Sequence, residues 1–161
     1  MKTLQLLFVI GVTIFSSLGT CRGSAGEIPL PDDIEISVPD PTLPEEIKKL
    51  SGKWSGTWNP VITAMAVLPL PCILVVEKIL SPKEVQVVYS IAETEQMKGE
   101  WRRFNAQIFQ KGKRTFISFA SARDAKRTFE FRLSGETLVG ELKTSSAWGD
   151  QIFSIVMKKI Q

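Results

Sequence analysis

The sequence predicts an all-β domain, namely an eight-stranded antiparallel up-and-down barrel preceded by a short helix. Two observations predict this fold: eight runs in which apolar and polar residues alternate, as in a sheet with one dry face, and short connections between consecutive runs. Consecutive hairpins form a meander, and a meander of eight strands protects its edges best by closing on itself. A barrel of this size is either filled by side chains or has room for one small ligand.

The helix is expected over residues 44–50. Pro44 stands at a suitable first helical position, with acids in the first turn and lysines in the last, and Gly52 then breaks the helix. The eight strands are expected at 53–58, 72–80, 85–91, 101–110, 114–120, 126–133, 137–143 and 151–160.

The first 25 residues read as a secretory signal, with Lys2, then an apolar run of about a dozen residues, then a small, weakly polar stretch. The apolar run is too short to span a bilayer, which needs about 20 residues. Gly23 and Ala25 suit cleavage after Ala25. The alternative is a bacterial lipoprotein signal over residues 18–21, in which Cys21 would be acylated and anchor the protein to the cell envelope. We expect a secreted or periplasmic protein.

The remaining chain divides into an acidic leader, residues 26–44, and a barrel domain, residues 45–161. Residues 27–46 carry seven acids, no basic residue and five prolines, which predicts an extended segment. From residue 47 onward, 18 Lys and Arg face 10 acids, a net charge of +8. These cations are scattered along the strands, so no nucleic-acid partner is expected. The leader could fold back on this basic surface.

Missing residue types exclude several kinds of chemistry. The chain contains no His, which excludes Ser-His-Asp and Cys-His catalysis. After signal cleavage Cys72 is the only cysteine, so neither a Cys/His zinc site nor an intramolecular disulfide can form. We expect Cys72 in the core. We expect no cofactor, no metal and no enzymatic activity.

The run from Glu45 to Trp54 resembles the opening of the lipocalin and wider calycin families, in which a short helix precedes Gly-x-Trp on the first strand. The resemblance covers residues 45–160 as a pattern of elements, and its specific sequence content is Gly52 and Trp54. It implies that Trp54 plugs one end of the barrel under a basic residue of the last strand, Lys158 or Lys159. The chain lacks the Thr-Asp-x-x-Tyr motif and C-terminal helix of classical lipocalins, so no particular ligand follows.

The candidate ligand-binding residues come from the inward faces and from one long connection. Residues 59–71 are strongly apolar although loops normally run through water. They could pack on the barrel wall, form a lid over its mouth or, if exposed, bind a partner. Glu77 shares the alternation of Ile73, Val75 and Ile79; it could be a buried, ligand-orienting carboxylate or equally an exposed one. The full set is Trp58, Met65, Leu68, Glu77, Tyr89, Phe104, Phe129 and Phe131.

These observations favour a binding module that holds a small, largely apolar molecule without chemistry. The alternative is a protein-interaction or accessory module with a filled barrel, whose partner would be another protein. The volume inside the barrel distinguishes the two, because a small-molecule site needs at least about 300 Å³.

Overall fold

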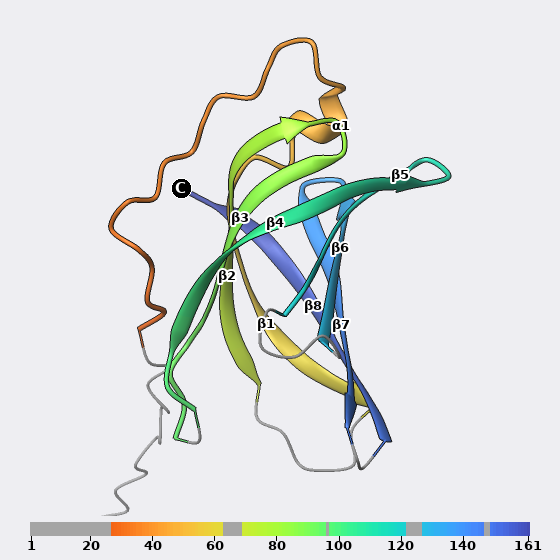
Figure 1. Ribbon diagram of the computed structural model, residues 1–161. Coiled ribbons are helices and arrows are strands. Elements are labelled where there is room, and N and C mark those ends of the chain that lie inside the picture. The colour runs from red at the N-terminus through yellow and green to blue at the C-terminus, as the bar shows by residue number, and fades with distance from the viewer. Residues whose placement is uncertain (1–26, 63–68, 96, 122–126, 147–148) are drawn as a thin grey trace, which may run out of the picture.

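The computed structural model describes residues 27–62, 69–95, 97–121, 127–146 and 149–161. It contains one short helix, α1 (Glu45–Lys48), and eight strands (Figure 1). The strands are β1 (Gly52–Ile62), β2 (Leu70–Ser81), β3 (Glu84–Ile91), β4 (Glu100–Lys111), β5 (Arg114–Ala120), β6 (Arg127–Ser134), β7 (Thr137–Ser146) and β8 (Gly149–Ile160). The predicted signal with Cys21 and the connection residues Met65 and Leu68 lie outside the described residues.

The strands form a closed barrel in sequence order, with β1 paired to β8. All eight neighbouring pairs are antiparallel. The predicted all-β, eight-stranded up-and-down barrel is therefore confirmed, and each predicted run coincides with a strand apart from a few terminal residues. β1 continues past its predicted end at Trp58 because its pairing with β8 extends to Ile62. No helix within the described ranges is long and apolar enough to cross a membrane.

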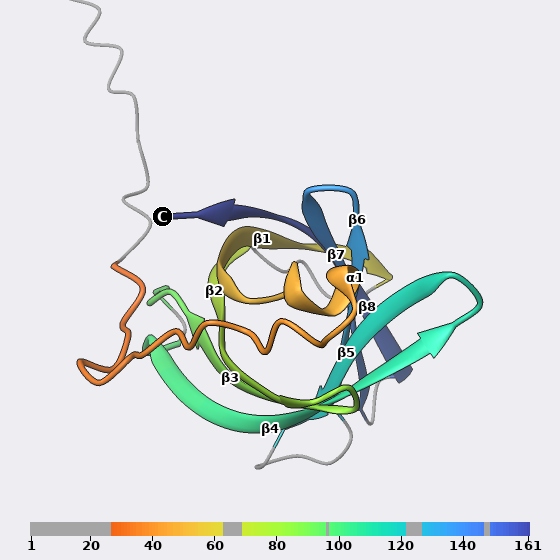
Figure 2. The same ribbon diagram turned by 90° about the horizontal axis from the view of Figure 1, so that it is seen from above.

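Helix α1 covers one end of the barrel, as the view along its axis shows (Figure 2). Ile47 and Leu50 are buried against the core, and the indole Nε1 of Trp54 donates to the carbonyl of Leu50 at 2.8 Å. Trp54 is 1% exposed, so the helix and the indole together close this end. This is the plug that the calycin resemblance implies for Trp54.

Of the two basic residues that the resemblance offers, Lys159 lies over Trp54, and the choice of Lys158 as the motif residue is wrong. The Nζ of Lys159 lies 5.1 Å from the Trp54 ring centroid and donates to the carbonyl of Lys49 at 3.2 Å. Register explains the difference: Lys159 lies opposite Trp54, whereas Lys158 lies opposite Ser55, one residue out of phase with the inner face. Gly52 has φ +119°, and a Cβ there would lie 2.8 Å from the Cε of Lys159.

Glu77 is buried, but on the outer wall of the barrel, so its assignment as a ligand-orienting residue is wrong. Val76 belongs to the inner core, so the adjacent Glu77 faces outward by simple alternation. A β-bulge follows, because Val76 lies opposite Val87 and the next paired residue is Lys78, opposite Gln86. The bulge shifts the alternation, which turns Ile79 towards the core while Glu77 stays outside. Glu77 meets Arg103 there, at 2.8 Å between Arg103 Nε and Glu77 Oε2.

The acidic leader covers Glu77. Residues 27–43 of this leader run along the outside of the barrel from the open end to α1 (Figure 1). Asp33 of this segment lies 3.1 Å from the guanidinium of Arg103, and the amide of Ser37 donates to the carbonyl of Glu77 at 2.8 Å. The fold-back considered from charge alone is thus present in the structure.

Gly52→Ala tests the close approach at the plug. The substitution should lower the free energy of unfolding by about 1–3 kcal/mol, because a side chain at this φ is strained and would also collide with Lys159. Urea unfolding followed by tryptophan fluorescence measures the loss. Gly112→Asn is the matched control, since Gly112 has φ +62° in a turn with nothing within 4 Å, a conformation that Asn adopts readily. Equal losses in the two variants would contradict the proposed collision.

Candidate functional site

The middle of the barrel is filled by a layer of aromatic side chains. The Nε1 of Trp58 donates to the hydroxyl of Tyr89 at 2.7 Å, and the Trp58 ring packs 5.7 Å from the Phe131 ring centroid. Phe119 and Phe129 stack at 4.9 Å and complete the layer. Trp58 and Phe131 are at most 2% exposed. The half of the barrel between this layer and the Trp54 plug is therefore packed.

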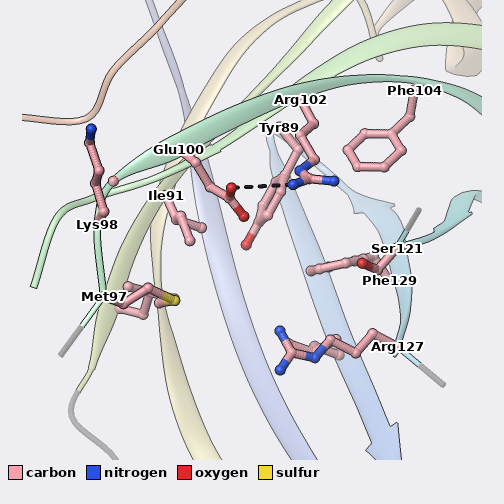
Figure 3. A pocket seen from close by; sticks show the side chains of 13 residues that line it. Tyr89, Ile91, Met97, Lys98, Glu100, Arg102, Phe104, Ser121, Arg127 and Phe129 are labelled. Atoms are coloured by element: carbon pink, nitrogen blue, oxygen red, sulfur yellow. Dashed lines mark hydrogen bonds and ion pairs between the residues drawn. The ribbon is translucent and has the colours of Figure 1, made fainter. Parts of the chain in front are cut away.

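A cavity of about 530 Å³ lies on the other side of the aromatic layer, at the open end (Figure 3). Its volume falls within the range of small-molecule sites, about 300–1,000 Å³. The lining comes from the ends of five strands, the connection between β3 and β4, and Ser121 just after β5. The lining residues are Leu70, Tyr89, Ile91, Met97, Lys98, Gly99, Glu100, Arg102, Phe104, Ser121, Arg127, Phe129 and Leu142.

The cavity combines apolar walls with a positively charged rim. Leu70, Ile91, Phe104, Phe129 and Leu142 supply aliphatic and aromatic surface, and all five pack against the core or belong to it.

Three cations, Lys98, Arg102 and Arg127, share this lining with a single acid, Glu100. The Nη2 of Arg102 lies 3.3 Å from Glu100 Oε2, and Arg127 reaches into the cavity from the side opposite Lys98 (Figure 3). The lining therefore has an excess of positive charge.

The structure brings together three of the eight predicted ligand-binding residues. Tyr89, Phe104 and Phe129 line the cavity. Trp58 and Phe131 lie beneath it in the packed layer, so they support the floor and do not line the space. Glu77 lies behind the wall, and Met65 and Leu68 lie outside the described residues.

Sequence reasoning missed the two arginines of the cavity. Arg102 precedes Phe104 by two residues, and Arg127 precedes Phe129 by two, so each shares the inward face of an aromatic residue that was predicted. The period-2 alternation could have found both. A cation on a strand is usually solvated, so the alternation by itself gives an arginine little weight as a lining residue.

Tyr89 and Cys72 are poor candidates for chemistry. Burial raises the pKa of the Cys72 thiol to about 12, and burial likewise raises the pKa of Tyr89 well above its usual range. Both groups therefore stay protonated at neutral pH, when a nucleophile would need the anion. Within the described ranges, no three acids or cysteines are arranged to hold a metal ion.

No protein-family model and no curated protein matches the sequence. Among solved structures, the crystal structure of zebrafish ileal bile acid-binding protein complexed with cholic acid is similar with a TM-score of 0.38 and 15% sequence identity. The match covers 70% of this chain and 99% of that one.

The buried thiol predicts how stability depends on alkaline pH. The pKa of Cys72 is raised in the folded protein, so the unfolded chain releases this proton first, and stability is lost as the pH rises from about 9 towards about 12. Cys72→Ala should reduce this loss by up to about 1.4 kcal/mol per pH unit. Urea unfolding at a series of pH values measures it. Parallel curves for the two proteins would show that the thiol does not contribute.

Proposed function

We propose that this barrel is a binding protein for a small, largely apolar molecule that carries an acidic group. The ligand would lie in the open-end cavity, with its apolar part against Phe104 and Phe129 and its acidic group near Arg102 and Arg127. The observation that carries the proposal is the joining of apolar walls and excess positive charge in one cavity of about 530 Å³.

The apolar walls and the arginines of the cavity would contribute to binding in different ways. Burying apolar ligand surface contributes about 25 cal/mol per Å² before the costs of association. Guanidinium groups are weakly hydrated and donate in a fork that matches carboxylate or sulfonate oxygens. Arg102 already pairs with Glu100, so a ligand acid would share or replace that partner.

The proposal contains no chemical step. The absence of His from the chain and the raised pKa values of Tyr89 and Cys72 support binding over catalysis. Export is also part of the proposal and rests on the signal-like residues 1–25, with anchoring through Cys21 as the alternative.

A pair of fluorescent probes tests the ligand class. Anilinonaphthalene sulfonate is apolar and anionic, whereas phenylnaphthylamine has a similar ring system without charge. Arg127→Met should weaken binding of the sulfonate about tenfold, because a charge-assisted hydrogen bond contributes about 1.5–3 kcal/mol, and should leave the neutral probe nearly unaffected. Fluorescence titration measures both.

Arg132→Met is the matched control, since Arg132 lies on the same strand but outside the cavity lining. It should change neither affinity. Failure of both probes to bind the unmodified protein would contradict a small-molecule site. Equal weakening by the two arginine variants would place the sulfonate elsewhere on the basic surface.

A further inference from the structure

The wall of the cavity between β2 and β4 has a second layer outside it, formed by residues 27–43, hereafter the acidic segment. Val75, Val88 and Ser90 belong to the outer face of this wall, yet each is 0% exposed. Val75 lies opposite Val88, and neither belongs to the core cluster inside the barrel. Side chains on the outer face of a barrel are buried only when something lies over that face, and the acidic segment contacts one of the three, Ser90, through the carbonyl of Pro29.

Specific polar contacts fix the acidic segment in place. Arg103 joins two acids, because its guanidinium bonds to Glu77 at 2.8 and 3.0 Å and to Asp33 at 3.1 and 3.3 Å. The amide of Ser37 donates to the Glu77 carbonyl. Nearer the mouth, the hydroxyl of Ser90 donates to the carbonyl of Pro29. The segment is thus attached to the wall at two places, at Glu77 and Arg103 and, nearer the mouth, at Ser90.

The attachment points alternate with residues that line the cavity. Ser90 stands between Tyr89 and Ile91 on β3, and Arg103 stands between Arg102 and Phe104 on β4. Neighbouring residues of a strand point to opposite faces, so a shift of either anchor moves a cavity side chain on each side of it.

The segment also touches the rim directly. A Cβ on Gly99, itself a lining residue, would lie 3.1 Å from the ring Cδ of Pro29.

We propose that the acidic segment positions the ligand cavity, with Asp33, Ser90 and Arg103 as positioning residues that act through the cavity wall. Docking of the segment and binding of an anionic apolar ligand then favour each other. This inference rests on the proposed function and adds to it that ligand affinity depends on a segment of the chain that lies outside the barrel.

The docking of the acidic segment should depend on salt, because one of its contacts is an exposed ion pair. Glu77 is a buried carboxylate that needs the cation of Arg103, whereas the side chain of Asp33 is 71% exposed, so solvent screens its pairing with Arg103. Hydrogen bonding to Arg103 lowers the pKa of Asp33, and the pair should weaken with salt. Coupling between two binding events is reciprocal, so a ligand in the cavity must tighten docking by the factor by which docking tightens the ligand.

The double variant Asp33→Asn/Ser90→Ala tests the coupling in the otherwise unmodified chain. Amide hydrogen exchange at Ser37 reports docking, and exchange at Ala92, whose amide donates to the carbonyl of Pro71 at 2.9 Å, reports the wall near the mouth. The variant loses the pairing of Asp33 with Arg103 and the hydrogen bonds of the Ser90 hydroxyl to the carbonyls of Pro29 and Glu100. This loss should speed exchange at Ser37 about tenfold or more and exchange at Ala92 severalfold. The affinity for anilinonaphthalene sulfonate should fall about three- to tenfold.

Two further variants separate positioning from general destabilisation. The single variant Asp33→Glu keeps the negative charge and leaves Ser90 in place, so it should behave as the unmodified protein. Asp32→Asn removes the neighbouring exposed acid, which makes no hydrogen bond or ion pair within the described part of the chain, and should change nothing. In the unmodified protein, saturating anilinonaphthalene sulfonate should slow exchange at Ser37.

The outcomes distinguish this inference from the proposed function. Faster exchange at Ser37 in the double variant, with Ala92 and probe affinity unchanged, would overturn positioning while leaving ligand binding intact. No effect of bound probe on Ser37 exchange would overturn it as well. If the unmodified protein binds no probe but Ala92 still exchanges faster in the double variant, positioning of the wall stands and the proposed function fails.

Discussion

Pairing of β1 with β8 is the constraint on which the rest of the structure depends. Once the sheet is closed, strand alternation sends every second side chain to an enclosed interior and the others outward. Adjacent arginines therefore have different roles: Arg102 lines the cavity, whereas Arg103 binds Glu77 on the outer wall. Closure also places Lys159 of the last strand over Trp54 of the first, which completes the plug.

The two ends of the barrel differ because different residues fill them. α1, Trp54 and the side chain of Lys159 close one end, and the layer containing Trp58, Tyr89 and Phe131 fills the middle. The cavity proposed for the ligand lies towards the mouth, with Arg102 and Arg127 in its lining. The barrel is thus filled by side chains in the half near Trp54 and hollow in the half near the mouth.

Opposite charges along the chain meet on the outer wall. The acidic segment has too many prolines and acids to form a core, and the barrel after residue 47 has an excess of cations. Where they meet, Arg103 forms ion pairs with both Asp33 of the segment and Glu77 of β2. A segment that composition alone describes as a linker becomes a second layer behind the cavity, because its Asp33 pairs with Arg103 and its Ser37 amide donates to the carbonyl of Glu77.

The sequence by itself determined the strands, their order and most inward side chains, because alternation and turn residues are local properties. It also located Gly52 and Trp54 at the closed end, and Tyr89, Phe104 and Phe129 on the face that lines the cavity. Only the tertiary structure decided which face of β2, and with it Glu77, points outward, the choice of Lys159 over Lys158 and the position of the acidic segment. Each of these depends on register or on contacts between residues distant in sequence, such as Asp33 and Arg103, and no local pattern encodes them.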